Sequence, residues 1–423
     1  MRSECGAWRL RQRKGWCAAV LLVAASAGSA QRLETEPTLR TRDLLPVGVE
    51  MDGRGYTLSA ETRLQGYLGQ YHIETDLGPI EAQGSEILIV RLAELPALAR
   101  IDQISRGQVF ADAIASSAKR TGAAVARVVT SPIETAKGIP AGIGRLLTRT
   151  ARSVRKLAQS AGDAASGGSG ASPSGSTVVD YAREAAGLNR ARRELAQSLG
   201  IDPYSGNPLL QARLESLAWA AVAGGLSMDI ALGAISGSAS QWVSISGKLD
   251  RMVWEKSPED IRDVLEKRLL DRGNEARGVR RFLRTPAFTP TLQIRMVEAL
   301  ERLGRPSGED AILALAAQAG SELHARFLIT QLAMLAQHTE VQDPIVELIA
   351  LSSSVAAETR GGVRIVSLPV DFLSYTDKVE EGTETARRVP ARLLVSGKVS
   401  SLAARELKRL DWDVRPELGL PPG

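Results

Sequence analysis

The sequence from Ser257 to Gly320 reads SPEDIRDVLEKRLLDRGNEARGVRRFLRTPAFTPTLQIRMVEALERLGRPSGEDAILALAAQAG. Its helix-capping residues and helix-ending glycines decide the expected fold. Ser257 precedes a proline and two acidic residues, which is typical of a helix N-terminus, and Gly273 stands where that helix would end. Thr289, again followed by proline, repeats the pattern up to Gly304. Because capping residues and helical spacing agree along the stretch, it predicts consecutive short helices.

The same pattern of helix-starting and helix-ending residues extends in both directions from this stretch. Ser321 begins a further expected helix that runs to about His338. On the other side, Asn207 and the proline after it begin another helix, and residues 180–199 form one that stops at a glycine. We therefore expect a helical domain over residues 178–350.

Residues 31–103 are expected to form an extended arm followed by a small α+β module. Tyr67 to Thr75 alternate polar and apolar positions, and a turn ending at Gly78 leads into a short apolar stretch, which together predict a hairpin. From Ser85 the apolar spacing becomes helical, with Pro96 as an expected kink or break.

The C-terminal residues 351–423 change in character. Residues 363–372 and 391–395 are typical of strands, and residues 400–410 have helical spacing, so a small βαβ unit is expected. Taken together, the patterns predict a mainly α protein. It would have a multi-helix domain, a small β-containing N-terminal module and a small α/β C-terminal element.

Residues 1–30 have the pattern of a secretory signal peptide. A basic stretch is followed by the apolar run Trp16 to Ala25 and by small residues ending at Ala30, after which we expect cleavage; a cut after Ala27 also fits the pattern. The run is too short to span a bilayer core of about 30 Å, although a short uncleaved anchor is an alternative. We therefore expect an exported protein, periplasmic or extracellular.

The expected mature chain contains no cysteine. Both cysteines, Cys5 and Cys17, lie in the leader, which excludes a disulfide, a cysteine nucleophile and a thiolate metal site. The three histidines also lack the spacing of metal ligands, since His324 and His338 are about 21 Å apart on one expected helix and His72 lies in the expected hairpin. We expect no metal ion and no cofactor.

A Ser396-Gly397-Lys398 sequence stands between an expected strand and an expected helix, where a phosphate-binding loop would lie. Arg392 occupies the position that the first glycine of such a loop needs, and Val399 replaces the metal-binding serine or threonine. An ordinary turn is therefore the favoured interpretation.

Residues 104–160 are expected to form basic helices. The leader accounts for +4 of the net charge of +5, so the rest of the chain is near neutral, yet nine basic residues and one acidic residue lie between Lys119 and Lys156. This charge has two interpretations, a solvated helix face or a contact with an anionic envelope surface or another envelope protein; export argues against nucleic acid. The candidate contact residues are Lys119, Arg120, Arg127, Arg145, Arg149, Arg152, Arg155 and Lys156.

Two further stretches differ in composition from the rest of the chain. Residues 161–177 are rich in glycine and serine and are expected to be a linker and a domain boundary. Residues 217–245 carry one charge, Asp229, in 29 residues. Their apolar content is mainly alanine, which favours a close-packed helical core over membrane association, and both interpretations stay open.

Residues 182–210, AREAAGLNRARRELAQSLGIDPYSGNPLL, resemble a family of uncharacterised exported bacterial proteins. The matching features are Arg192-Arg193-Glu194-Leu195-Ala196, then Asp202-Pro203-Tyr204-Ser205, then Asn207-Pro208. The resemblance implies no activity. Physically, the motif predicts a helix end, a turn and a new helix cap at Asn207, and it leaves the roles of Asp202, Tyr204 and Asn207 unknown.

The sequence therefore favours a non-enzymatic helical scaffold or interaction protein of the cell envelope, with the basic helices as its contact surface. The alternative is a cell-envelope hydrolase that uses carboxylates, with Asp202, Asp229 or Asp371 as candidates. Such a hydrolase needs an acid and a base in one cleft with their pKa values pushed apart.

Overall fold

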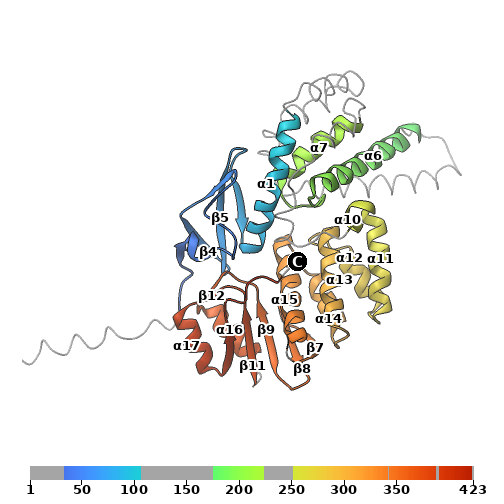
Figure 1. Ribbon diagram of the computed structural model, residues 1–423. Coiled ribbons are helices and arrows are strands. Elements are labelled where there is room, and N and C mark those ends of the chain that lie inside the picture. The colour runs from blue at the N-terminus through green and yellow to red at the C-terminus, as the bar shows by residue number, and fades with distance from the viewer. Residues whose placement is uncertain (1–32, 106–174, 223–250, 342, 387–389, 422–423) are drawn as a thin grey trace, which may run out of the picture.

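The computed structural model describes residues 33–105, 175–222, 251–341, 343–386 and 390–421 (Figure 1). Helices make up 49% and strands 20% of these residues, and the strands form three sheets. The prediction of a mainly α protein is therefore wrong, and the described part is a mixed α and β structure. The leader, the basic helices, the glycine/serine linker and Asp229 lie almost wholly outside the described residues.

The N-terminal module is a six-stranded antiparallel sheet. Its strands are β1 (Thr38–Arg40), β2 (Asp52–Gly53), β3 (Tyr56–Leu58), β4 (Glu61–Gln65), β5 (Leu68–Thr75) and β6 (Ile80–Gln83). They lie in the order β1-β4-β5-β3-β2, with β6 paired to β5. The expected hairpin is confirmed, since His72 of β5 lies opposite Glu81 of β6. The expected extended arm instead contains β1 and a short 3-10 helix, η1 (Thr41–Asp43).

Helix α1 packs on this sheet, and two further helices join the same core. The three helices are α1 (Ser85–Ser105), α6 (Gly175–Leu199) and α7 (Pro208–Val222). Tyr71 and Ile73 of β5 belong to the same buried cluster as Leu98 of α1 and Leu214 of α7. This core thus joins residues from both sides of the segment 106–174. Helix α1 runs through Pro96 without ending there.

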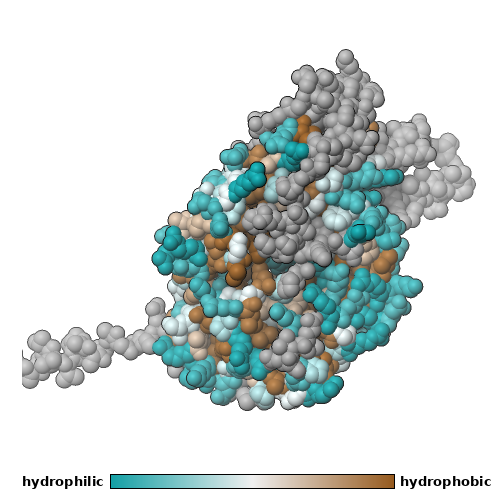
Figure 2. All heavy atoms as spheres, in the orientation of Figure 1, coloured by the Kyte–Doolittle hydropathy of each residue, from teal (hydrophilic) through white to brown (hydrophobic). Residues whose placement is uncertain are grey.

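A layer of six helices follows. They are α10 (Met252–Glu255), α11 (Pro258–Asp271), α12 (Ala276–Leu283), α13 (Pro290–Arg302), α14 (Glu309–Ala316) and α15 (Glu322–Val341). The expected caps are confirmed: Ser257 accepts a hydrogen bond from the Asp260 amide at 3.2 Å, and Thr289 accepts one from the Leu292 amide at 3.3 Å. Figure 2 shows hydrophilic residues over the outer side of α11 and α12, as expected where one helix face meets water.

The C-terminal sheet has the order β13-β11-β9-β8-β7. Its strands are β7 (Ile345–Ala350), β8 (Val355–Thr359), β9 (Arg364–Leu368), β11 (Ala391–Val395) and β13 (Trp412–Arg415). Two helices, α16 (Asp377–Ala386) and α17 (Ser401–Arg409), join the later strands, and a small parallel pair is formed by β10 (Phe372–Leu373) and β12 (Lys398–Val399). The expected βαβ unit is confirmed, because β11 and β13 are parallel and α17 lies between them in the chain.

The C-terminal sheet is the middle of three layers, which explains why some of its strands were missed. Ile365 packs toward the layer of α10–α15, whereas its neighbour Val366 packs toward α16 and α17. A strand that is buried on both faces shows no alternation of polar and apolar residues. Strand β8 is of this kind, whereas β7 lies at the edge of the sheet with Val346 exposed and is a short apolar run inside the range 178–350 that the sequence predicted to be helical.

Candidate functional site

The motif with Asp202 and Asn207 forms the turn between α6 and α7. Gly200 has a φ of 67°, which ends α6 in the left-handed region that glycine tolerates. The Asp202 carboxylate accepts a hydrogen bond from the Tyr204 amide at 2.8 Å. Asn207 Oδ1 then accepts from the Leu209 amide at 3.1 Å and thereby caps α7, as the sequence predicted. The local spacing of the motif is therefore explained by turn geometry.

A buried polar network around Glu94 holds the same turn against α1. Glu94 itself is 4% exposed. Glu94 accepts hydrogen bonds from Arg91 at 3.1 Å, from Asn207 Nδ2 at 2.8 Å and from the Ser205 hydroxyl. Each of these groups is buried, and a buried carboxylate is tolerated only when such partners replace its water. The network was missed by sequence reasoning, because Glu94 and Ser205 are 111 residues apart in the chain.

Asp202 also reaches the helical layer, where it lines a small cavity. Its Oδ1 accepts a hydrogen bond from the Thr291 hydroxyl at 2.7 Å, and Arg295 and Arg326 line the same cavity. Burial raises the pKa of Asp202, and the bonds from Tyr204 and Thr291 offset only part of that rise. The cavity measures about 60 Å³, which is room for a few water molecules. Ligand pockets are usually about 300–1,000 Å³, so this one is too small for an organic substrate.

Arg326 connects the cavity to the N-terminus of α1. Its guanidinium donates to Glu86 at 3.1 Å and to Glu322 at 2.9 Å, and Thr330 donates to the other oxygen of Glu86 at 2.8 Å. These carboxylates raise the pKa of Arg326 against the opposing effect of burial. The ion pairs hold α15 against α1, which is a structural function.

Asp371 lies at the N-terminus of α1. Its carboxylate accepts hydrogen bonds from the Ser85 amide at 3.1 Å, the Gly69 amide at 2.7 Å and the Tyr71 hydroxyl at 3.3 Å. Burial raises the pKa of Asp371, and these donors counteract that effect. The residue therefore joins the C-terminal sheet region to the N-terminal module.

The two described carboxylates proposed for a hydrolase do not meet. Asp371 bonds to Ser85, whereas Asp202 lies in the cavity lined by Glu94, nine residues further along α1. A rise of 1.5 Å per residue separates these two points of the helix by about 14 Å. The third candidate, Asp229, and all eight basic contact residues lie outside the described residues. Tyr204 is half-buried against the helical core, and burial raises its pKa to about 12.

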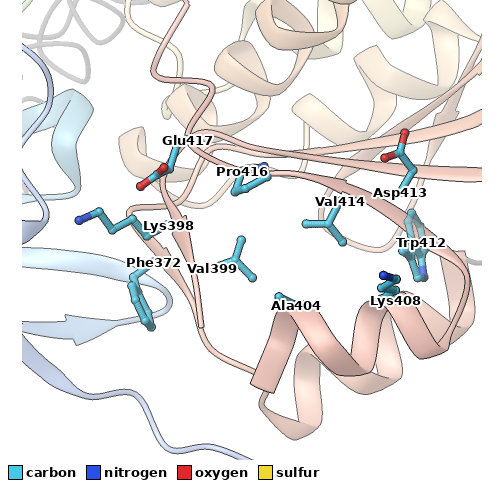
Figure 3. A pocket seen from close by; sticks show the side chains of 10 residues that line it. All are labelled: Phe372, Lys398, Val399, Ala404, Lys408, Trp412, Asp413, Val414, Pro416 and Glu417. Atoms are coloured by element: carbon cyan, nitrogen blue, oxygen red, sulfur yellow. The ribbon is translucent and has the colours of Figure 1, made fainter. Parts of the chain in front are cut away.

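A groove of about 630 Å³ lies beside β13 and α17 (Figure 3). Of the residues weighed in the sequence, Lys398 and Val399 of the rejected phosphate-loop motif line it. Its walls combine apolar side chains with two lysines and two acidic residues, and contain no histidine, cysteine, serine or threonine. The lining residues are Phe372, Lys398, Val399, Ala404, Lys408, Trp412, Asp413, Val414, Pro416 and Glu417. The lining therefore offers no serine, threonine or cysteine nucleophile and no histidine base.

Among the described residues, no group of three or more histidine, cysteine, aspartate or glutamate side chains is placed to hold a metal ion. No helix of that part is both long and apolar enough to cross a membrane. Comparison with known proteins gives no match to a protein-family model, to a curated protein or to a solved structure. The function is therefore argued from the geometry alone.

His72 provides a test of the electrostatics at the N-terminal sheet. Its ring lies between Glu81 and Glu74, with Nε2 at 2.7 Å from Glu74, and these two carboxylates raise its pKa. We expect NMR titration of the imidazole to give a pKa above the ordinary value of about 6.5. The small stabilisation is present below pH 6.5 and is lost as the pH rises through the folded-state pKa. Replacing both carboxylates by glutamine should return the pKa to about 6.5; an unchanged pKa would contradict the assignment.

Proposed function

We propose that the protein is an exported, non-enzymatic interaction protein of the bacterial cell envelope. It contacts an anionic envelope surface or another envelope protein through the eight basic residues between Lys119 and Lys156. The observation that supports this proposal is the arrangement of α1, α6 and α7. These helices place at one end of the molecule the described residues that flank two segments of unusual composition, 106–174 and 223–250.

Contacts between α1 and α7 define this arrangement. Asn207, at the start of α7, bonds to Glu94 at 2.8 Å, and Arg213 bonds to Asp102 at 2.7 Å. Both helices therefore run in the same direction. Helices α1 and α7 are parallel, and their C-termini, Ser105 and Val222, lie at the same end. The N-terminus of α6 is at that end too (Figure 1).

The two segments that leave this end differ in charge. Segment 106–174 carries ten basic and three acidic residues, a net charge of +7, and segment 223–250 is rich in alanine, glycine and serine. The opposite end of α1 is attached to the rest of the molecule through Asp371 and Arg326. The segment with this positive charge follows directly in the chain after the C-terminus of a firmly anchored helix, which supports a contact with an anionic surface.

The charge proposal predicts salt-dependent binding to anionic vesicles. Replacing Arg145, Arg149, Arg152 and Arg155 by glutamine should weaken co-sedimentation with phosphatidylglycerol vesicles at low salt by at least about tenfold, since each basic residue near such a surface contributes about 1 kcal/mol. The melting temperature should change little. Binding should also weaken as salt is raised, because ions screen the attraction.

A matched control removes the same number of charges from the described surface. Arg277, Arg280, Arg281 and Arg284 are exposed on or beside α12, and their replacement by glutamine should leave vesicle binding unchanged. Equal loss in the two variants would show that only the total charge matters. A wild-type protein that ignores anionic vesicles at low salt would remove the vesicle contact altogether.

A further inference from the structure

Two surface helices, α12 and α16, carry stripes of opposite charge at the same spacing. In each helix the charged residues stand at positions i, i+3, i+4 and i+7, which lie along one side of a helix. The stripe of α12 and its C-cap is basic and consists of Arg277, Arg280, Arg281 and Arg284. The stripe of α16 is acidic and consists of Asp377, Glu380, Glu381 and Glu384. Glu380 is half-buried, the other seven residues are exposed, and one lysine, Lys378, lies beside the acidic stripe.

Each stripe repels itself, because like charges three or four residues apart on a helix are unfavourable. Other surface helices of the protein place opposite charges at this spacing. Arg190 pairs with Glu194 on α6 at 2.8 Å, and Arg409 pairs with Glu406 on α17 at 2.7 Å. The stripes of α12 and α16 therefore gain attraction only from charges outside their own helix.

The described part of the chain supplies few such charges. Arg280 pairs with Glu266 of α11 at 3.3 Å, and Glu380 accepts a hydrogen bond from the Tyr375 hydroxyl at 3.4 Å. The other six charged groups of the two stripes form no ion pair with another described residue. Most of the charge in both stripes is thus available to a partner.

The two stripes cannot pair with each other within one molecule. Val279 and Phe282 of α12 belong to the core on one side of the C-terminal sheet, and Val379 of α16 belongs to the core on the other side. The sheet therefore separates the two helices. Their partners must come from elsewhere.

A second copy of the chain fits both stripes at once. Each stripe extends over seven residues, or about 10 Å at a rise of 1.5 Å per residue. The spacing reads the same in both directions, so an antiparallel pair of helices places Arg277 opposite Glu384 and Arg284 opposite Asp377, with the middle residues also matched. The helix dipoles favour this antiparallel arrangement. The basic segment 106–174 could reach only the acidic stripe and would leave the arginines of α12 without a partner.

We infer that the protein associates with further copies of itself, with α12 of one copy antiparallel to α16 of the next. Each copy then presents one basic and one acidic face, so the contact is heterologous and repeats into a chain or a ring. Exposed ion pairs are individually weak, so the protein is a monomer at about micromolar concentration and associates at higher concentration and low salt. Vesicle binding at micromolar protein does not involve this contact.

Sedimentation velocity of the full mature chain tests the inference. The sedimentation coefficient of the wild-type protein should rise with concentration at about 20 mM salt and return to the monomer value at about 0.5 M salt, because ions screen exposed charges. Two variants each remove one face: Arg277→Glu with Arg281→Glu on α12, and Glu381→Arg with Glu384→Arg on α16. Each variant alone should associate at least about tenfold more weakly than wild type.

Mixing the two variants separates a lost contact from a damaged fold. The α12 variant keeps a native acidic face and the α16 variant keeps a native basic face, so together they should form a one-to-one dimer and nothing larger. A variant that had lost its fold would not regain association on mixing. The control Arg42→Glu with Arg63→Glu reverses two exposed charges of the N-terminal module and should associate as wild type does.

Four outcomes would overturn the inference. The first is a wild-type protein that stays monomeric at about millimolar concentration and low salt. The second is a mixture of the two variants without a dimer. The third is equal loss of association in the Arg42/Arg63 control, which would assign the effect to total charge. The fourth is loss of association when Arg145, Arg149, Arg152 and Arg155 are replaced by glutamine, which would place the basic segment on the acidic stripe.

Discussion

Replacing Glu94 by alanine should lower the free energy of unfolding by about 3–5 kcal/mol, the usual cost of removing one partner from a buried ion pair. Arg91, whose side chain is 9% exposed, would lose its carboxylate partner. The Ser205 hydroxyl and Asn207 Nδ2 would lose an acceptor as well. Because this network holds α1 to the turn before α7, the loss should appear in chemical denaturation of the whole protein.

The control for this prediction is an exposed pair of the same chemistry. Glu194 pairs with Arg190 at 2.8 Å on the surface of α6, and its replacement by alanine should change stability little. A double variant, Arg91→Met with Glu94→Leu, should recover part of the loss, since it removes both charges together. A Glu94→Ala variant as stable as Glu194→Ala would show that the network does not stabilise the protein.

Sequence reasoning located elements whose signals are local. The capping box of Ser257 and Asp260 and the cap at Thr289 depend on residues three apart, and both are formed as predicted. Strands β7 and β8 carry no such signal, because residues 345–359 form two short apolar runs joined by serines, and in β8 burial on both faces removes the alternation. The fold class was wrong because short strands without an alternating pattern, such as β1, β7 and β8, were not expected as strands.

The same distinction applies to the candidate site. The turn around Asp202 and the cap at Asn207 followed from local spacing, but the partner of that turn, Glu94, is separated from it by more than a hundred residues. A signal did exist, since Arg91 and Glu94 stand at helical spacing in an otherwise apolar stretch, where charged residues need partners. The groove gave no sequence signal, because its walls come from three separate segments that the fold brings together.

Replacing Gly397 by alanine should destabilise the protein by about 3 kcal/mol or more, at the upper end of the cost of overpacking. A Cβ atom at this position would lie 2.5 Å from the Val370 carbonyl oxygen and closer still to that of Asp371. The two chain segments cannot move apart, because Ser396 Oγ donates to Val370 at 2.8 Å and the Lys398 amide donates to Asp371 at 3.0 Å. The glycine that stood in the position of a phosphate-binding loop is thus explained by this close approach of two backbones.

The matched control is Gly382 in α16, around which a Cβ atom would meet nothing within 4 Å. Alanine there should stabilise the protein by about 0.5–1 kcal/mol, because glycine in a helix costs conformational entropy. Thermal and chemical unfolding should therefore separate the two glycine variants in opposite directions. If Gly397→Ala is as stable as wild type, the backbones of residues 370–371 and 396–398 are not held as closely as these hydrogen bonds require. In that case the hydrogen bond from the Ser85 amide, at the N-terminus of α1, to Asp371 would also be in question, since Asp371 is positioned by the same contact.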